Sequence, residues 1–574
     1  GYGQIYDFDC NNNFDNPVLN SVTLKSFVGG DQNVPAGNTD WQDVMYKTGI
    51  VTNNSLTASV GSKNSSLEIN IGHLKNSGML RHTGYERISG SISALTRSFN
   101  DKVTFGLNLR IANSDETLTA RDLGGASTTF LAVTLSPTIP VYQKDGTTFA
   151  GPLGAGYSDR NNPLHMQYLS RWNNANRLST FGNIFVEIQP VKNLFFRSNI
   201  GADNATFSSK IISPNFVEGA LARTTNSLSF DRNHFLGITW SNTLRYNWDL
   251  NEKNSFKFLV GTEYLKRKID FDFTRKEGFA LQTEEYFTLN AATGNTTATG
   301  GYTGHQLFSQ FARVDYNHAD KYLAAVTVRR DGSSRFGANN QYGIFPAVSV
   351  GWRIDKEAFM QNSKLFSELK IRAGFGRVGN QEALNDVTKS TLFATRYGTT
   401  QAQLTGGFFE QYYNVGTAYS LSGVNTGTLP SGFVQAQAGN PDLKWEATQE
   451  INTGIDFSLL KNKIFGSFDY FSRKTTGILI SPPVAAVLGE GQNKIVNGAS
   501  KTNKGWELTV GYRGEKRKDF SYNVLLNFAH FRDKITELPE NVRAAYAGIP
   551  GNDILGQSQF DIFGYKTAGL FQSQ

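Results

Sequence analysis

The stretch VTVRRDGSSRFG, residues 326–337, leads into a second alternating segment, AVSVGWRI, residues 347–354. In the second segment the large apolar residues fall at every second position and small or charged residues fill the gaps: Val348, Val350, Trp352 and Ile354 against Ala347, Ser349, Gly351 and Arg353. Side chains of a β-strand point alternately to the two faces of its sheet. The pattern predicts a strand with one apolar face and one polar face, joined to its predecessor by a polar connection.

The same alternation recurs along the whole chain, and helical periodicity is rare, with one short candidate near Glu357–Glu368. About 17 segments fit the strand template. They are 55–61, 66–74, 87–98, 102–113, 178–188, 194–203, 236–248, 255–266, 304–316, 321–330, 344–354, 368–376, 448–459, 464–473, 504–513, 520–530 and 557–567.

The connections between these strands alternate between short and long. The short ones are rich in turn-forming residues: SFNDK (98–102), QPVKN (189–193), NHADK (317–321), LKNK (460–463) and GEKRKD (514–519). The long ones are 114–177, 204–235, 267–303, 377–447, 474–503 and 531–556. In an up-and-down meander, alternate connections lie on the same rim. We therefore predict an all-β fold: a transmembrane antiparallel up-and-down β-barrel with short periplasmic turns and long extracellular loops.

This architecture explains the opening stretch. Val348, Val350, Trp352 and Ile354 would face lipid. Arg353 and its small neighbours would face the lumen, since an arginine facing lipid near the midplane costs about 2–4 kcal/mol. The polar RRDGSSRFGANN would be an outer loop in water. Backbone groups at membrane depth must all be paired, and closure of a barrel pairs them.

Composition alone does not separate a barrel from a soluble multidomain protein. The 574 residues are 39% hydrophobic and 13% aromatic, and mean hydropathy is −0.36. No run approaches the roughly 18 apolar residues of a spanning helix. Interfacial aromatic girdles or an ordinary β-rich core would both explain the aromatic content.

The basic charge does not indicate nucleic-acid binding. The formal net charge is +7 and the pI is about 9.1, but lysine and arginine are scattered and form no concentrated stripe. The single cysteine, Cys10, excludes an internal disulfide. The opening GYGQIYDFDC shows no signal peptide, which suggests a mature or truncated start.

No motif announces an enzyme, a cofactor or a metal. GFGRVG (374–379) matches a dinucleotide fingerprint but lacks the following helix and acidic residue, so we interpret it as a strand end entering a glycine-rich loop. The seven histidines show no metal-ligand spacing. Glu450 and Asp456 lie on polar strand faces, where they are better partners for arginine than an acid–base pair.

One aromatic cluster is the candidate binding segment. Residues 383–447 contain GFFEQYYN, with Phe408, Phe409, Tyr412 and Tyr413. Exposed aromatics can stack on sugar rings or anchor a partner protein. The alternative is that these rings pack the loop onto itself or onto its neighbours.

Several long stretches resemble the SusC/RagA family of TonB-dependent outer-membrane transporters of Bacteroidetes. They include YLAAVTVRRDGSSRFGANNQYGIFPAVSVGWRI, GNPDLKWEATQEINTGIDFSLLKNKIFGSFDYFSRKTTGILI, LKIRAGFGRVGNQ, NKGWELTVGY and SPTIPVYQKDGTTFAGP. The resemblance spans almost the whole chain in the family's order. It implies a bacterial outer-membrane importer of oligosaccharides or oligopeptides, surrounded by lipid and lipopolysaccharide.

The resemblance also implies partners and missing parts. It implies a SusD-like surface lipoprotein as a lid, TonB as the energy source, and a dimer of transporter–lid pairs. The family barrel has about 22 strands around an N-terminal plug. Residues 1–574 therefore match a partial barrel, from which the plug, the TonB box, one strand before and about four strands after are expected to be absent. A passive porin and a surface binding protein remain the alternatives.

Overall fold

The structure is a computed structural model of the chain. It describes residues 5–9, 20–121, 125–153, 157, 159–361, 363–382, 384–395, 433–482, 494–514, 520–545, 554–562, 564, 566 and 569. Its main element is a sixteen-stranded sheet with the order β22-β21-β20-β19-β16-β15-β14-β13-β12-β11-β8-β7-β6-β5-β4-β3. Each strand of this sheet pairs with the sheet strand that precedes or follows it in sequence, as an up-and-down meander requires; β9, β10, β17 and β18 are skipped because they form separate two-stranded sheets.

The sheet strands are β3 (Val51–Gly61), β4 (Ser65–Asn76), β5 (Gly84–Ser98), β6 (Val103–Thr117), β7 (Asn174–Val191), β8 (Leu194–Ser213), β11 (Ser227–Asn251), β12 (Asn254–Glu277), β13 (Thr296–His318), β14 (Tyr322–Ser333), β15 (Tyr342–Arg353), β16 (Phe366–Asn380), β19 (Glu446–Leu459), β20 (Ile464–Ile480), β21 (Val496–Arg513) and β22 (Asn523–Glu537). The first sixteen predicted strands each coincide with one of these. The predicted strand pattern is confirmed for this sheet.

Smaller elements lie in the connections. Three hairpins are β1 (Tyr6–Asp9) with β2 (Ser21–Leu24), β9 (Phe216–Glu218) with β10 (Leu221–Arg223), and β17 (Leu392–Thr395) with β18 (Phe433–Gln437). The α-helices are α1 (Trp41–Met45), α2 (Thr128–Thr134), α3 (Pro163–Leu169) and α5 (Glu540–Ala545). Short 3-10 turns are Val28–Gly30, Glu284–Tyr286, Leu289–Ala291, Ala338–Asn340, Ile354–Lys356 and Ala358–Met360.

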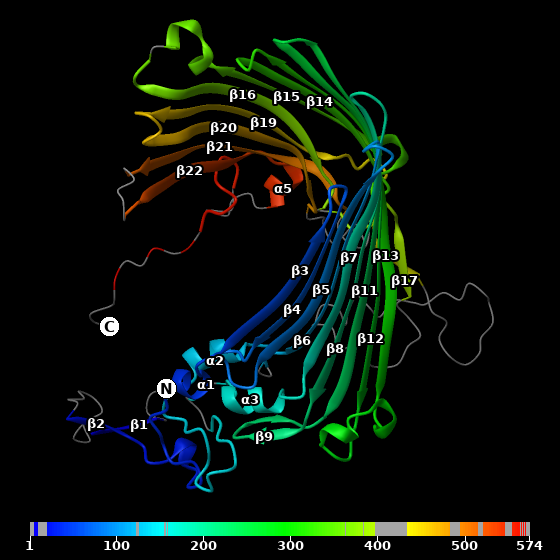
Figure 1. Cartoon of the computed structure of the whole chain (residues 1–574). Coiled ribbons are helices and arrows are strands. Elements are labelled where there is room, and N and C mark those ends of the chain that lie inside the picture. Colours follow the sequence, from blue (N-terminus) through cyan, green and yellow to red (C-terminus); the bar gives the residue numbers. More distant parts are fainter. Residues whose placement is uncertain are drawn as a thin grey trace. The chain divides into compact units, whose positions relative to one another are not determined.

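The described chain divides into two compact units. The first comprises 1–186, 199–239 and 267–304, and the second comprises 187–198, 240–266 and 305–574. In the first unit, β3, β4, β5 and β6 run side by side, and in the second unit the same is true of β14, β15, β16 and β19 to β22 (Figure 1). None of the described helices is both long and apolar enough to cross a lipid bilayer.

The tight connections owe their geometry to left-handed residues. Positive φ angles outside glycine cluster in the predicted short turns, at Phe99, Asn100 and Asp101, at Asn193, at Ala319 and Asp320, and at Leu460, Lys461 and Asn462. Turns that match the right-handed twist of a hairpin require this backbone region, which Asn and Asp tolerate best. The short-turn rim is therefore encoded locally.

On the other rim the strands continue far beyond their predicted ends. β11 has 25 residues and β12 has 24, whereas a tilted strand crosses a bilayer in about 9–11 residues. Parts of the predicted long loops 204–235 and 267–303 are therefore strand. Beyond the predicted end of β12, Ile269 and Phe271 still alternate with Asp270 and Asp272, so the predicted boundaries were too short although the alternation continues.

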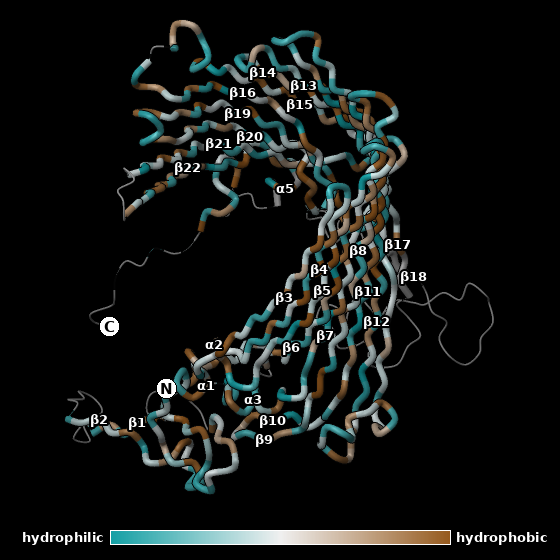
Figure 2. The backbone as a smooth tube through the Cα atoms, in the orientation of Figure 1, coloured by the Kyte–Doolittle hydropathy of each residue, from teal (hydrophilic) through white to brown (hydrophobic). Residues whose placement is uncertain are grey.

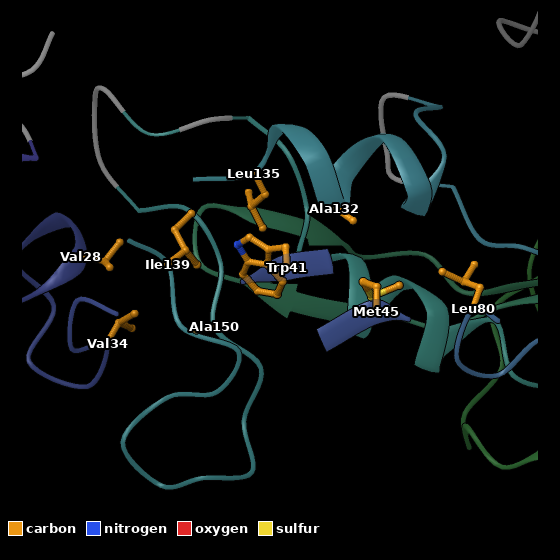
Figure 3. Close-up of a cluster of buried hydrophobic side chains, with 9 residues drawn as sticks. All are labelled: Val28, Val34, Trp41, Met45, Leu80, Ala132, Leu135, Ile139 and Ala150. Carbon is orange, nitrogen blue, oxygen red and sulfur yellow. The ribbon is translucent and has the colours of Figure 1, made fainter. Parts of the chain in front are cut away.

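In the first unit, the segment before β3, the β4–β5 connection and the long β6–β7 connection fold around a common apolar core. It contains Val28, Val34, Trp41, Met45, Leu80, Ala132, Leu135, Ile139 and Ala150, all at most 6% exposed. Figure 3 shows the Trp41 indole beside Leu135 and Ile139; its Nε1 donates to the Ser136 carbonyl at 3.1 Å. Asp40 caps α1 by accepting from the backbone N–H of Gln42 and Asp43. These segments are therefore held together by a packed apolar core.

Two secondary-structure predictions and one motif interpretation were wrong. The helix expected near Glu357–Glu368 is only the 3-10 turn Ala358–Met360 before β16 begins. GFGRVG lies inside β16, which continues to Asn380 because β19 pairs with it along its length, from Phe366↔Leu459 to Asn380↔Glu446.

The third wrong prediction is the strand at 557–567. Its described residues form turns, closed by the Ser558 N–H donating to the Asp561 carboxylate at 3.2 Å and by Ser558 Oγ donating to Asp533. Phe560 and Ile562 create the period-two signal but are 75% and 98% exposed. A local polar turn therefore outweighs the alternation.

Candidate functional site

One face of the second unit's strands is apolar and exposed. Cross-strand pairing aligns Val326 with Val348, Val348 with Phe375, and Phe375 with Ile451, across β14, β15, β16 and β19. These four side chains are 46%, 42%, 41% and 56% exposed. Figure 2 shows hydrophobic and hydrophilic residues interleaved along these strands. A continuous apolar row of this kind is expected on a surface that contacts lipid.

An aromatic and charged cluster borders this apolar face near the short-turn rim. The rings of Tyr322 and Trp352 stack with centroids 6.5 Å apart. Glu357 accepts hydrogen bonds from Tyr322 Oη at 2.6 Å, from Trp352 Nε1 at 3.1 Å and from Lys321 Nζ at 3.1 Å. These hydrogen bonds lower the pKa of Glu357 to about 2; the bond from Tyr322 contributes most, followed by those from Trp352 and Lys321. Amphipathic aromatics of this type belong at a membrane–water interface.

A second border lies toward the long-connection rim. The Arg330 guanidinium lies 3.7 Å from the centroid of the Tyr342 ring, and its Nη1 donates to Gln310 Oε1 at 3.0 Å. Tyr342 and Trp352 lie at opposite ends of β15, so they are separated by roughly 33 Å along the strand. With a tilt near 40° the rise is roughly 25 Å, the height of an outer-membrane apolar band.

The opposite face of the same strands is charged. Arg372 on β16 binds two carboxylates: its Nη1 and Nη2 each lie 2.6 Å from an Asp469 oxygen, and its Nε lies 3.1 Å from Asp456 Oδ1. Lys370 adds a contact to Asp456 at 3.7 Å. Gly454 makes this possible, because a Cβ there would lie 2.7 Å from Asp469 Oδ1 and 2.8 Å from Arg372 Cζ.

The charged face carries further ion pairs. Arg329 contacts Asp331 at 2.7 Å and Glu263 at 2.9 Å, and Arg473 contacts Glu450 at 2.6 Å. The prediction that Glu450 and Asp456 are partners of arginine on a polar face is confirmed. Such pairs keep the charges hydrogen-bonded on a wall that would line a water-filled lumen.

A hollow of about 620 Å³ opens on this charged face. Its lining combines small residues with charged and amide groups, including Lys257, Asp315, Ser349, Lys370, Arg372 and Asn452. Small side chains leave the space, and the polar groups at its border can hydrogen-bond a hydrated ligand. The arrangement suits contact with a polar molecule or a polar protein surface.

The connection after β14 departs from its prediction as a loop in water. Phe336 is 0% exposed and packs with Leu384, Leu443 and Trp445. Arg335, 9% exposed, contacts Asp386 at 2.7 Å, and Asp386 also lies 3.0 Å from His305 Nδ1. Buried polar groups require such partners. Asp386 is 51 residues from Arg335 in sequence, so the polar composition of the connection was wrongly taken to mean that it lies in water.

A similar buried cluster joins connections of the first unit. Glu218, 0% exposed, lies 2.6 Å from His165 Nδ1 and accepts from the Asn162 backbone N–H at 2.6 Å. The Phe149 ring stacks on His165 with centroids 4.4 Å apart. This cluster was not predicted from the sequence, because its members lie far apart in the chain and form no recognisable motif.

The predicted binding aromatics Phe408, Phe409, Tyr412 and Tyr413 lie outside the described residues.

Comparison with known proteins agrees with this geometry. The family model described as TonB dependent receptor-like, beta-barrel matches residues 11–554. TonB-dependent receptor P3 of Formosa agariphila is 25% identical over 549 residues, covering 93% of this chain and 51% of that protein. TonB-dependent receptor SusC of Bacteroides thetaiotaomicron is 26% identical over 536 residues, covering 87% and 48%.

Among solved structures, the RagAB peptide transporter matches with a TM-score of 0.73 at 22% identity, covering 88% of this chain and 54% of the matched chain. At that identity the likeness shows the fold alone. The chain spans about half the length of the curated relatives it matches. With the family match, the apolar band and the charged opposite face, this chain belongs to the TonB-dependent receptor-like β-barrel family of the bacterial outer membrane.

Proposed function

We propose that the protein is an outer-membrane active importer of oligosaccharides or oligopeptides. In this proposal the described strands form the wall of its barrel, a plug outside these 574 residues closes the lumen, TonB supplies the energy, and a SusD-like surface lipoprotein acts as a lid. One observation carries the proposal. The same strands have an apolar face bordered by aromatic residues and an opposite face that carries ion pairs and a hollow.

The opposite face supports passage of a polar cargo. Arg372, Asp456 and Asp469 satisfy one another, so this part of the wall is hydrophilic and its charges are paired. The nearby hollow adds room for a hydrated molecule or for a plug surface. An apolar wall would favour neither a hydrated cargo nor a polar plug surface.

The packed long connections support a lid partner. A lid that opens and closes needs a firm edge to contact, and the cores around Trp41 and around Phe336 provide ordered surfaces at the ends of the strands. Within this proposal, Phe408, Phe409, Tyr412 and Tyr413 contact cargo or lid. The matched RagAB protein is described as a peptide transporter, and the oligosaccharide class follows from the sequence resemblance to the SusC/RagA family.

The test is energised uptake by the full-length protein in cells. Labelled oligosaccharides and oligopeptides are offered with and without functional TonB and with the proton gradient collapsed. We expect accumulation of one cargo class that requires both TonB and the gradient.

Equal accumulation without TonB would instead support a passive porin. Binding to the cell surface without accumulation, with TonB intact, would support a surface binding protein. A fourfold Phe408→Ala, Phe409→Ala, Tyr412→Ala and Tyr413→Ala variant tests the loop separately. Its matched control replaces exposed aromatics at the short-turn rim, Phe99→Ala and Phe520→Ala.

A further inference from the structure

Three basic side chains and one histidine lie on neighbouring segments at the long-connection rim of the first unit. Lys47 and Arg81 lie on two segments that are tied together: the Lys47 N–H donates to the Met79 carbonyl at 2.8 Å, and the Arg81 N–H donates to the Met45 carbonyl at 3.0 Å. Arg81 Nε also donates to the Val44 carbonyl at 2.7 Å, which fixes its guanidinium. His82 follows Arg81. The paired segments therefore bring two cations, Lys47 and Arg81, and the His82 imidazole close together in the fold.

The third cation, Arg171, lies close to two aromatic rings. Its Cζ is 3.8 Å from the centroid of the Tyr168 ring and 3.7 Å from that of the Trp172 ring, and its Nη1 donates to the Tyr168 carbonyl at 2.7 Å. The other side of the cluster reaches the same tyrosine, because the His82 ring lies edge-on to Tyr168 at 6.1 Å. Tyr168 thus connects Arg171 with His82.

The charges are close enough to influence one another. Burial is the main cause that lowers the pKa of His82, and the positive charges of Arg171, Lys47 and Arg81 lower it further. In the part of the chain that the structure describes, no carboxylate lies within 4.0 Å of any of the four, although Glu284 acts on Arg171 from farther away. Like charges repel, and His82 also adopts a left-handed φ of 57°. Backbone strain of this kind is enriched at functional sites.

We infer that Lys47, Arg81, His82 and Arg171 form a binding site for oxyanion groups, the carboxylates or sulfates of an anionic cargo. A clamped guanidinium is pre-organised for two parallel hydrogen bonds to an oxyanion, so little conformational freedom is lost on binding. An anion also removes the repulsion within the cluster. The naming of the ligand as cargo rests on the proposed import function, and a lipopolysaccharide phosphate would offer the same chemistry.

The experiment measures binding of sucrose octasulfate, with sucrose as its neutral match, to the full-length protein in detergent. The test variant is Lys47→Gln with Arg81→Gln. The control variant, Lys63→Gln with Lys102→Gln, removes the same two charges from exposed short turns of the same unit. We expect saturable, salt-sensitive binding of the sulfated sugar alone, weakened about tenfold or more in the test variant and unchanged in the control.

Equal weakening in both variants would show that net charge is responsible and would overturn the site, as would an absence of saturable binding at low salt. Cooperative melting of each variant shows that it is folded, and Arg171→Lys gives a second variant that keeps the charge but loses the planar fork. Repeating the titration in nanodiscs with and without lipopolysaccharide identifies the source: competition by lipopolysaccharide in the control but not the test variant assigns the site to the lipid phosphate. If the full-length protein binds the sulfated sugar but does not take up cargo, the import proposal is overturned and the binding site still stands.

Discussion

Side chains on both faces of strands β14 to β16 and β19 are exposed, but the two faces carry opposite chemistry. Val350 is 52% exposed on one face, while Arg372 is 32% exposed on the other. On a soluble protein, exposure would mean water in both cases. Here the exposed apolar row ends in the aromatic clusters at Trp352 and Tyr342, whereas the charged face is bound into ion pairs. Exposure therefore shows that a solvent is present, and only the side chains show which solvent it is.

The largest effect is expected when a charge is moved from one face to the other. Val350→Arg places a guanidinium in the apolar band and should destabilise the folded barrel by about 2–4 kcal/mol. Ser349→Arg, one residue away on the charged face, should cost much less. Urea unfolding of the full-length protein in lipid vesicles measures both, and equal destabilisation would mean that the two faces meet the same solvent.

A smaller effect is expected from breaking the ion pairs of the charged face. Arg372→Gln leaves Asp456 and Asp469 close together without their cation and should cost about 2 kcal/mol. Lys257→Gln is the matched control, because Lys257 borders the same hollow on the charged face and forms no ion pair among the described residues. The same unfolding assay applies. An unchanged midpoint for the Arg372 variant would show that the wall does not depend on this network.

A still smaller effect is expected at the glycine that accommodates the network. Gly454→Ala introduces a Cβ within 3 Å of Asp469 Oδ1 and Arg372 Cζ, so one of the flexible side chains must shift, at about 1 kcal/mol. In an Arg372→Gln background the penalty should fall, since the clash with the guanidinium is gone. A double-mutant cycle measures this coupling, and strict additivity would argue against it.

The smallest effect concerns the border of the apolar face. Because hydrogen bonds lower the pKa of Glu357 from 4.5 to about 2, its contribution to stability is fully present above about pH 4.5 and is lost as pH falls toward 2. Glu357→Gln should remove that part of the acid dependence. Melting curves between pH 2 and 6 compare the variant with the parent, and identical pH profiles would contradict the assignment.

Prediction from sequence succeeded where structure is local and periodic. Every strand of the large sheet was anticipated, because alternation reports a two-faced strand and because residues such as Asn100 and Asp320 mark tight turns. It failed where distant segments decide the outcome. Arg335 and Phe336 looked like a hydrated loop, yet Asp386 and Leu443 bury them. The extra length of β11 and the cationic cluster around Arg171 were likewise invisible in any single window of sequence.

The sequence by itself therefore determined the two-faced strands, the tight turns at one rim and, through its resemblance, the family of the chain. These follow from side-chain alternation and from backbone preferences, which act over a few residues. Only the tertiary structure decided that the long connections are packed, that Gly454 gives Arg372 room to bridge two aspartates, and that Arg171 and His82 both lie against Tyr168. Those features depend on contacts between residues far apart in the chain, and such contacts carry no local signal.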